Sequence, residues 1–162
     1  MNYVVGFLFE ADLQRVLLRL KARPAWQRGK LNGIGGKVEE GETPLYAMRR
    51  EGREEASCSD QHLLSPGWGL FRTERFRGDS PDGLSGAVLH CFTARSLHAL
   101  EHFCPNEYTV VKDGKELEPN TPVYYSTVPT LSREGRVLYN LEYLVPCAKV
   151  WLESGEHRRP LP

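Results

Sequence analysis

The sequence predicts a single α/β domain, and three observations carry this expectation. The chain has 162 residues, a length that fits one compact domain. Hydrophobic residues make up 40% and charged residues 26% of the chain, which supplies material for a core and excludes the composition of a disordered protein. Short runs rich in β-branched and aromatic residues flank a strongly helical segment. We expect residues 1–153 to form the domain and the polar, proline-rich residues 154–162 to be a flexible tail.

The first part of the chain predicts two strands and a loop. Residues 3–9 and 16–20 are short apolar runs separated by a polar connection, a pattern that is typical of a β-hairpin. The basic segment 21–30 then leads to the glycine-rich segment 33–37. We expect this second segment to be a loop, because few side chains there obstruct the approach of a ligand to the backbone.

A helix signal begins at Thr43 and Pro44. A threonine hydroxyl caps the first turn of a helix, and proline is favoured at the first helical position. Good helix formers continue to Ala56, where we expect the helix to end. The remaining patterns predict two strands, a short helical piece, a hairpin, a strand and a terminal helix, in the segments 69–77, 86–95, 96–103, 108–117, 123–128 and 137–152. Pro146 should kink the terminal helix or start a new turn.

Charge and cysteine usage exclude several classes of protein. Lys and Arg total 21, as do Asp and Glu, so the net charge of zero gives no overall field that recruits DNA, RNA or an anionic membrane. The longest apolar run near the start is too short to span a bilayer, and no basic residue precedes it as in a signal peptide. The cysteines form no C-x-x-C pair. We therefore expect a cytoplasmic protein with no nucleic-acid polymer or membrane as a partner.

Acidic side chains are concentrated on one face of the expected helix. Glu51, Glu54 and Glu55 follow the i, i+3, i+4 spacing, which directs their carboxylates to the same side. Clustered carboxylates repel one another unless a cation lies among them, and hard oxygen ligands suit Mg²⁺ or Mn²⁺. Arg50 lies on an adjacent face, where it can form an ion pair with Glu42 of the preceding loop. We expect a divalent-metal site that suits a phosphate substrate.

The same segment resembles the Nudix box, G-x5-E-x7-R-E-U-x-E-E-x-G-U, in which U is an apolar residue. Six positions match it: Gly36, Glu42, Arg50, Glu51, Glu54 and Glu55. The sequence departs from the box at Gly52, Ser57 and Cys58, and none of these is one of its catalytic carboxylates. The resemblance implies the fold of that family, an α/β/α sandwich around a mixed β-sheet.

The resemblance also implies a reaction and the residues that support it. The Nudix family hydrolyses a nucleoside diphosphate linked to another group, and its metal ions activate the attacking water and neutralise phosphoryl charge. Glu42 and Arg50 would form a structural clamp. The metal ligands would be the backbone carbonyl of Gly35 and the carboxylates of Glu51, Glu54 and Glu55.

A general base must still accept a proton from the attacking water. By resemblance, either Glu54 or Glu55 on the helix is suitable. Some family members use a carboxylate from a later loop instead, for which Glu118 is the first candidate and Glu116 the second.

The end of the second strand and the approach to the box indicate a class of nucleotide. They look like the Nudix branch that destroys oxidised purine triphosphates such as 8-oxo-dGTP. By this resemblance Asn32 would read the purine edge, while Lys21, with Arg23 close by, would face the phosphates. The acidic pair that this branch has before its last helix is missing, and Asn140 stands near its place.

We therefore expect a Mg²⁺-dependent pyrophosphohydrolase, with Mn²⁺ as a possible substitute, that releases a nucleoside monophosphate and pyrophosphate from a small-molecule nucleotide. It would act as a monomer or a homodimer. One alternative is a diphosphatase acting on ADP-ribose or a related dinucleotide. A second alternative is a regulatory protein that binds a nucleotide without turnover. The intact acidic cluster argues against this last possibility, because a binding module needs no full set of metal ligands.

Overall fold

The computed structural model describes residues 1–21, 25–77, 84–103, 122–126 and 141–155. The expected hairpin at 108–117 lies outside these residues, as do the start of the expected terminal helix and most of the expected tail. Four residues with a predicted role in the site also lie outside them: Arg23, Glu116, Glu118 and Asn140.

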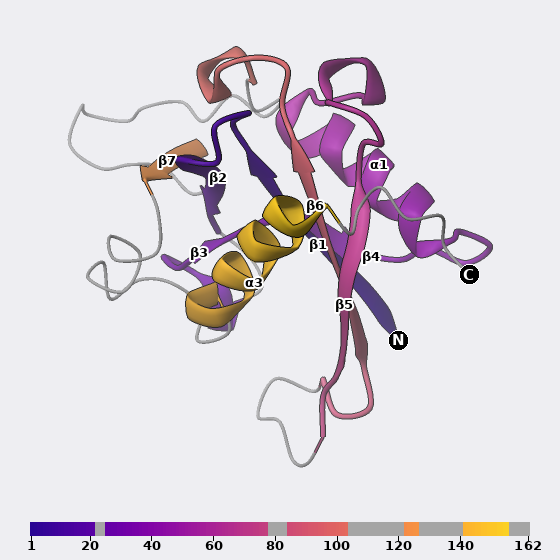
Figure 1. Cartoon of the computed structure of the whole chain (residues 1–162). Coiled ribbons are helices and arrows are strands. Elements are labelled where there is room, and N and C mark those ends of the chain that lie inside the picture. Colours follow the sequence, from indigo (N-terminus) through magenta and orange to yellow (C-terminus); the bar gives the residue numbers. More distant parts are fainter. Residues whose placement is uncertain (22–24, 78–83, 104–121, 127–140, 156–162) are drawn as a thin grey trace.

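The described strands form one seven-stranded mixed sheet (Figure 1). Its main path runs in the order β3-β2-β1-β6-β5, while β4 pairs with β1 and β7 pairs with β2. Strands β1 and β6 run parallel, and the other pairs named here are antiparallel. The expected hairpin of the first two strands is confirmed, since Leu8 pairs with Leu17. The bounds are β1 Asn2–Phe9, β2 Arg15–Leu20, β3 Leu31–Asn32, β4 Ile34–Lys37, β5 Gly69–Arg75, β6 Val88–Arg95 and β7 Pro122–Ser126.

Two helices cover opposite faces of the sheet, which gives three layers (Figure 1). Helix α1 spans Pro44–Ala56 and helix α3 spans Leu141–Ser154. Alternate residues of β1 divide between two apolar cores, because successive side chains of a strand point to opposite faces. Phe7 packs on the α3 side, whereas Val4 and Leu8 pack on the α1 side. This arrangement is the α/β/α sandwich that the resemblance to the Nudix box implies.

The glycine-rich segment 33–37 departs from expectation. We expected a loop, but Ile34–Lys37 form strand β4, in which Gly35 pairs with Val5 of β1. A Cβ at Gly35 would lie 2.1 Å from the carbonyl oxygen of Val4, far inside van der Waals contact. The glycine thus permits the close approach of two backbones. The prediction of a loop was wrong because glycine marks such a contact as readily as it marks a turn.

The other element boundaries follow the sequence more closely. Strand β5 ends at Arg75 rather than at residue 77, and β6 begins at Val88 rather than at residue 86. The short helical piece is reduced to a 3₁₀ turn at Leu100–His102. Helix α3 contains Pro146 within one element, so no new helix starts there. Among the described residues, no helix has the length and apolar character needed to cross a membrane.

Candidate active site

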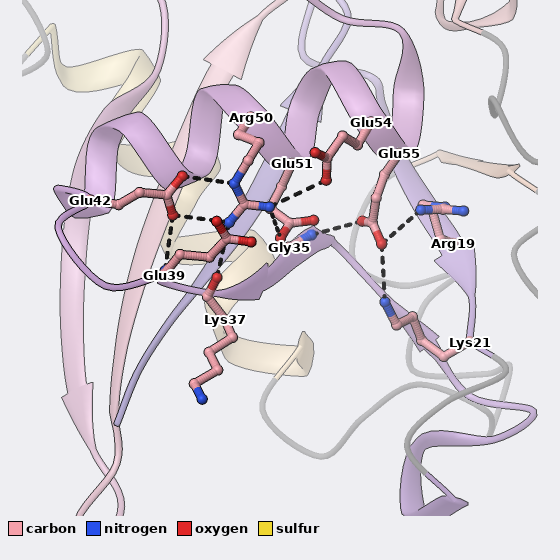
Figure 2. Close-up of polar contacts among 10 residues, drawn as sticks. All are labelled: Arg19, Lys21, Gly35, Lys37, Glu39, Glu42, Arg50, Glu51, Glu54 and Glu55. Carbon is pink, nitrogen blue, oxygen red and sulfur yellow. Dashed lines mark hydrogen bonds and ion pairs between the residues drawn. The ribbon is translucent and has the colours of Figure 1, made fainter.

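Helix α1 carries most of the predicted site, and its sequence determines where it begins and ends. The Thr43 hydroxyl accepts a hydrogen bond of 3.2 Å from the Tyr46 backbone N–H, and Pro44 follows as the first helical residue. The predicted cap and proline are therefore confirmed. The helix is followed by Ser57 in a left-handed conformation, with φ 52° and ψ 30°. The helix packs over β4, so its acidic face meets the glycine-rich strand (Figure 2).

Arg50 links the helix to the two segments that precede it (Figure 2). Its Nε and Nη2 donate to the two carboxylate oxygens of Glu42 at 2.7 and 3.0 Å, and Nη2 also donates to the Lys37 carbonyl oxygen at 3.0 Å. A guanidinium that binds both oxygens of a carboxylate gives a strong and directional contact. The structure thus contains the ion pair that the sequence predicts. This pair holds the preceding loop and β4 against α1.

Glu42 is also held from within its own loop. Its Oε2 accepts a hydrogen bond of 2.9 Å from the Glu39 backbone N–H. The hydrogen bonds from Arg50, and after them the one from Glu39, hold the pKa of the Glu42 carboxyl below its ordinary value of 4.5. Glu42 is therefore a carboxylate at neutral pH, with both oxygens engaged in holding the loop.

Glu51 is the buried member of the acidic cluster. The residue is 9% exposed, and Arg50 Nη1 donates to its Oε1 at 2.8 Å. A Cβ at Gly36 would lie 2.3 Å from the same oxygen, so the glycine leaves the space that this carboxylate fills. Burial raises the pKa of Glu51, and the Arg50 hydrogen bond opposes that rise. The negative charges of Glu55 and Glu54 raise this pKa further.

Glu54 and Glu55 are neighbours with different surroundings. The Glu54 side chain is 59% exposed, and its Oε2 accepts a hydrogen bond of 3.2 Å from Arg50 Nη1. The Glu55 side chain is 18% exposed, and both of its oxygens are engaged. Its Oε1 pairs with Arg19 Nη1 at 2.8 Å and with Lys21 Nζ at 3.4 Å. Its Oε2 accepts a hydrogen bond of 2.9 Å from the Gly35 backbone N–H.

The donor set on this face fits a divalent cation, because Mg²⁺ and Mn²⁺ prefer carboxylate and carbonyl oxygens. Glu51, Glu54 and Glu55 project from one helix face, and the negative charges of Glu55 and Glu54 raise the pKa of Glu51. The part of the chain that the structure describes holds no group of three His, Cys, Asp or Glu side chains arranged to bind a metal ion. The three carboxylates instead contact basic side chains. A metal ion would have to draw them away from these partners or share them.

The two described residues with predicted substrate contacts are engaged within the chain. The Lys21 side chain is 12% exposed and lies beside Glu55. The Asn32 amide nitrogen donates to Gln27 Oε1 at 3.3 Å, and its oxygen accepts a hydrogen bond of 2.8 Å from the Gly33 backbone N–H. The phosphate contact of Lys21 and the purine contact of Asn32 stay predictions. Reading a purine through the Asn32 amide nitrogen would replace its hydrogen bond with Gln27.

Arg19 lies in the site but was missed by the sequence-based predictions. On β2, Leu18 and Leu20 pack on the α3 side, so alternation turns Arg19 to the α1 side together with Leu17. Arg19 is only 3% exposed. A charged residue at a strand position that alternation places between sheet and helix is the signal that could have identified it.

The three departures from the box have structural explanations. A Cβ at Gly52 would lie 3.2 Å from the Cys58 carbonyl oxygen and 3.5 Å from Trp68 Nε1, so the tryptophan packs where an apolar side chain was expected. Cys58 is fully buried in the α1-side core. Burial raises the pKa of its thiol to about 12, and Cys58 therefore serves as an apolar residue. Ser57 adopts the left-handed conformation that glycine adopts more readily.

A comparison with protein families identifies this arrangement. Residues 2–122 match the family model described as NUDIX domain. The chain belongs to the Nudix family. The match includes the glycine-rich strand, helix α1 and the acidic cluster, so the resemblance seen in the sequence is confirmed at the level of the family. Membership supports the expectation that this Nudix protein is an enzyme of the pyrophosphohydrolase class.

Solved structures with a similar fold come from several proteins. The NUDIX domain of Shewanella oneidensis NrtR complexed with ADP ribose is 19% identical, with a TM-score of 0.66 over 94% of this chain and 88% of that chain. The E. coli dihydroneopterin triphosphate pyrophosphohydrolase is 17% identical, with a TM-score of 0.65 over 92% and 94%. Shewanella oneidensis NrtR complexed with a 27mer DNA is 17% identical, with a TM-score of 0.63 over 94% and 62%. These likenesses confirm the Nudix fold, and the absence of a nucleic-acid partner stays a prediction.

Proposed function

We propose that this Nudix protein is a Mg²⁺-dependent pyrophosphohydrolase that converts a nucleoside triphosphate into a nucleoside monophosphate and pyrophosphate. One observation carries the proposal. The carboxylates of Glu51, Glu54 and Glu55 lie on one face of α1 over the glycine-rich strand β4, with the cations Arg19 and Lys21 beside them. Acidic groups for a metal therefore lie beside Lys21, the proposed phosphate contact.

The metal would be held by four ligands, with Mn²⁺ able to replace Mg²⁺. When bound, it would lower the pKa of the attacking water and neutralise charge on the phosphoryl oxygens. The proposed ligands are the backbone carbonyl of Gly35 and the carboxylates of Glu51, Glu54 and Glu55.

The chain itself would orient the reactants and accept the proton. Water attacks the α-phosphorus, the bond from that phosphorus to the leaving pyrophosphate oxygen breaks, and a carboxylate takes the proton of the water. Glu54 suits this role because its side chain is 59% exposed, whereas both oxygens of Glu55 are engaged. Glu118, from a later segment, is the rival base. The ion pair of Arg50 and Glu42 would hold helix α1 and the loop before it in place beside the substrate.

A purine triphosphate, 8-oxo-dGTP in particular, is the first substrate to test. The proposal rests on the resemblance of the segments around Lys21 and Asn32 to the branch that acts on oxidised purines. A structural neighbour that is named a triphosphate pyrophosphohydrolase also supports it. ADP-ribose is the second candidate, because the structurally similar NUDIX domain of Shewanella oneidensis NrtR was solved in complex with it.

Product analysis separates these possibilities. Purified protein is incubated with Mg²⁺ and either dGTP, 8-oxo-dGTP or ADP-ribose, and the products are resolved by chromatography. A nucleoside monophosphate with pyrophosphate supports the proposal, whereas AMP with a sugar phosphate supports the second candidate. Reactions with a chelator, and with Glu54→Gln, are the controls. Tight nucleotide binding without hydrolysis in the presence of Mg²⁺ would show that the enzyme assignment is wrong.

A further inference from the structure

Arg19 is a buried arginine at a position where the sheet would accept an apolar residue. It is 3% exposed, and its neighbour on the same side of β2, Leu17, belongs to the apolar core under α1. Burying a guanidinium is costly unless the charge is paired, and apolar residues often replace a buried ion pair without loss of stability. The Arg19 charge is paired with the Glu55 carboxylate at 2.8 Å. Packing alone therefore gives no reason for an arginine here, and its partner points to a role in the site.

The Glu55 carboxylate is surrounded by hydrogen-bond donors. Arg19 and Lys21 contact its Oε1, and the Gly35 backbone N–H donates to its Oε2. Figure 2 shows these two cations on the far side of the acidic cluster from Arg50. Any further cation that binds Glu55 must share the carboxylate with Arg19 or displace it. The positive charge of Arg19, whose Nη1 lies 2.8 Å from Glu55 Oε1, also repels a second cation at this carboxylate.

We propose that Arg19 is a built-in counter-ion that neutralises Glu55 in the metal-free protein and weakens the binding of a divalent cation there. Arg19 acts through Glu55 and is thus a positioning residue, not a catalytic one. The inference rests on the proposed metal-dependent function. Its consequence is that the cation binds firmly only when nucleotide phosphates add further oxygen ligands. The metal then arrives with the substrate instead of residing permanently in the free enzyme.

Mn²⁺ binding to the nucleotide-free protein tests this inference without relying on turnover. Isothermal titration calorimetry gives the Kd for Mn²⁺ in wild type and in Arg19→Met, which keeps the length of the side chain but removes its charge. We expect the Kd to fall at least about fivefold in Arg19→Met, because a competing charge is lost. We expect Arg19→Lys, which keeps the charge, to stay within about twofold of wild type.

Thermal unfolding adds a signature that a structural role would not produce. Without metal, Arg19→Met should have a lower Tm, because the acidic cluster loses a neutralising partner. The rise in Tm on adding Mn²⁺ should be larger in this variant than in wild type, because tighter binding stabilises the folded state more. Arg15→Met is the matched control. Arg15 lies on the same strand and pairs with Glu10 and Glu101, outside the cluster, so its loss should lower Tm without changing the effect of Mn²⁺.

Each outcome decides the inference. If wild type binds Mn²⁺ and Arg19→Met binds it equally or more weakly, the counter-ion role is wrong while the proposed hydrolase stands. If neither protein binds Mn²⁺, the metal site and the inference both fail. In a Glu55→Gln background, Arg19→Met should change the Kd much less, because only the direct repulsion between Arg19 and the cation is left, and an undiminished change would refute action through Glu55. If Arg19→Met does not fold, Lys21→Met removes the second cation from the same oxygen and must shift the Kd in the same direction.

Discussion

The Arg50 guanidinium binds both carboxylate oxygens of Glu42, with Nε and Nη2 at 2.7 and 3.0 Å from them. The same guanidinium reaches the Lys37 carbonyl oxygen of β4 and the carboxylates of Glu51 and Glu54. One side chain therefore joins the loop before α1, the glycine-rich strand and the acidic face of the helix. Substituting Glu42 should consequently lower the stability of the protein and displace the acidic cluster.

The stability of the folded protein should depend on pH through Glu42. Its pKa is below the ordinary value of 4.5 in the folded state, so the unfolded chain binds a proton more readily than the folded one. The stabilisation that the Glu42 carboxylate contributes is present above pH 4.5 and is lost as the pH falls through the folded-state pKa. Glu42→Gln should therefore be less stable than wild type at neutral pH, and the difference should shrink in acid. Chemical denaturation at several pH values measures this, and a constant difference would contradict it.

Much of the fold and the acidic cluster follows from local sequence signals. The cap at Thr43, the proline after it and the spacing of Glu51, Glu54 and Glu55 predict both the helix and the face that carries the carboxylates. These signals are short in range, because capping and i, i+4 geometry depend only on nearby residues. The uninterrupted apolar run of β1, which is buried from Val4 to Phe9, is likewise typical of a strand covered on both faces.

The remaining features depend on contacts between distant segments. Gly35 lies in a strand because β1 approaches it, and no local pattern distinguishes that situation from a turn. Arg19 has a partner that is 36 positions away in the sequence, at Glu55, so a search for motifs in one segment does not find the pair. The internal hydrogen bonds of the Asn32 amide also depend on the path of the basic segment, which the composition does not determine.

The described cysteines should differ widely in reactivity. Burial raises the pKa of the Cys58 and Cys91 thiols to about 12 from 9.0, which lowers their thiolate fraction about a thousandfold. Cys147 is only partly buried. We expect brief alkylation of the native protein with iodoacetamide, followed by peptide mass spectrometry, to label Cys147 and spare the other two. Labelling in denaturant is the control, and rapid native labelling of Cys58 or Cys91 would contradict the buried arrangement.

The carboxylates of Glu54 and Glu55 should be needed for turnover far more than for folding. Glu54→Gln or Glu55→Gln should lower kcat at least about 10²-fold, because each removes a charge from the proposed metal site. Both changes are nearly isosteric, so circular dichroism should stay close to wild type. The Tm of Glu54→Gln should also stay close to wild type, whereas Glu55→Gln should have a lower Tm because it removes a charge partner of the buried Arg19. Glu40→Gln, at an exposed position outside the cluster, is the matched control and should keep full turnover. Wild-type turnover in both cluster variants would exclude these residues from the site.

Two adjacent glycines of β4, Gly35 and Gly36, should lose different amounts of stability when each is replaced by alanine. A Cβ at Gly35 would lie 2.1 Å from the Val4 carbonyl oxygen, a backbone atom. Gly35→Ala should therefore separate β4 from β1 and lower the free energy of unfolding by about 2–4 kcal/mol. A Cβ at Gly36 would lie 2.3 Å from Oε1 of Glu51, the end of a flexible side chain. In Gly36→Ala this carboxylate can turn away, so the fold should lose only about 1 kcal/mol, the value of one hydrogen bond.

Turnover and Mn²⁺ affinity separate the two glycine variants further. Gly36→Ala displaces a proposed metal ligand, so its kcat should fall at least about tenfold and its affinity for Mn²⁺ should weaken even though the protein is folded. Gly35→Ala should lose at least the activity that its unfolded fraction in denaturation curves accounts for, because moving β4 also moves the Gly35 carbonyl, a proposed metal ligand. If Gly36→Ala is the less stable variant, or if it keeps wild-type turnover, the Glu51 carboxylate does not depend on the space beside β4 in the way the structure indicates.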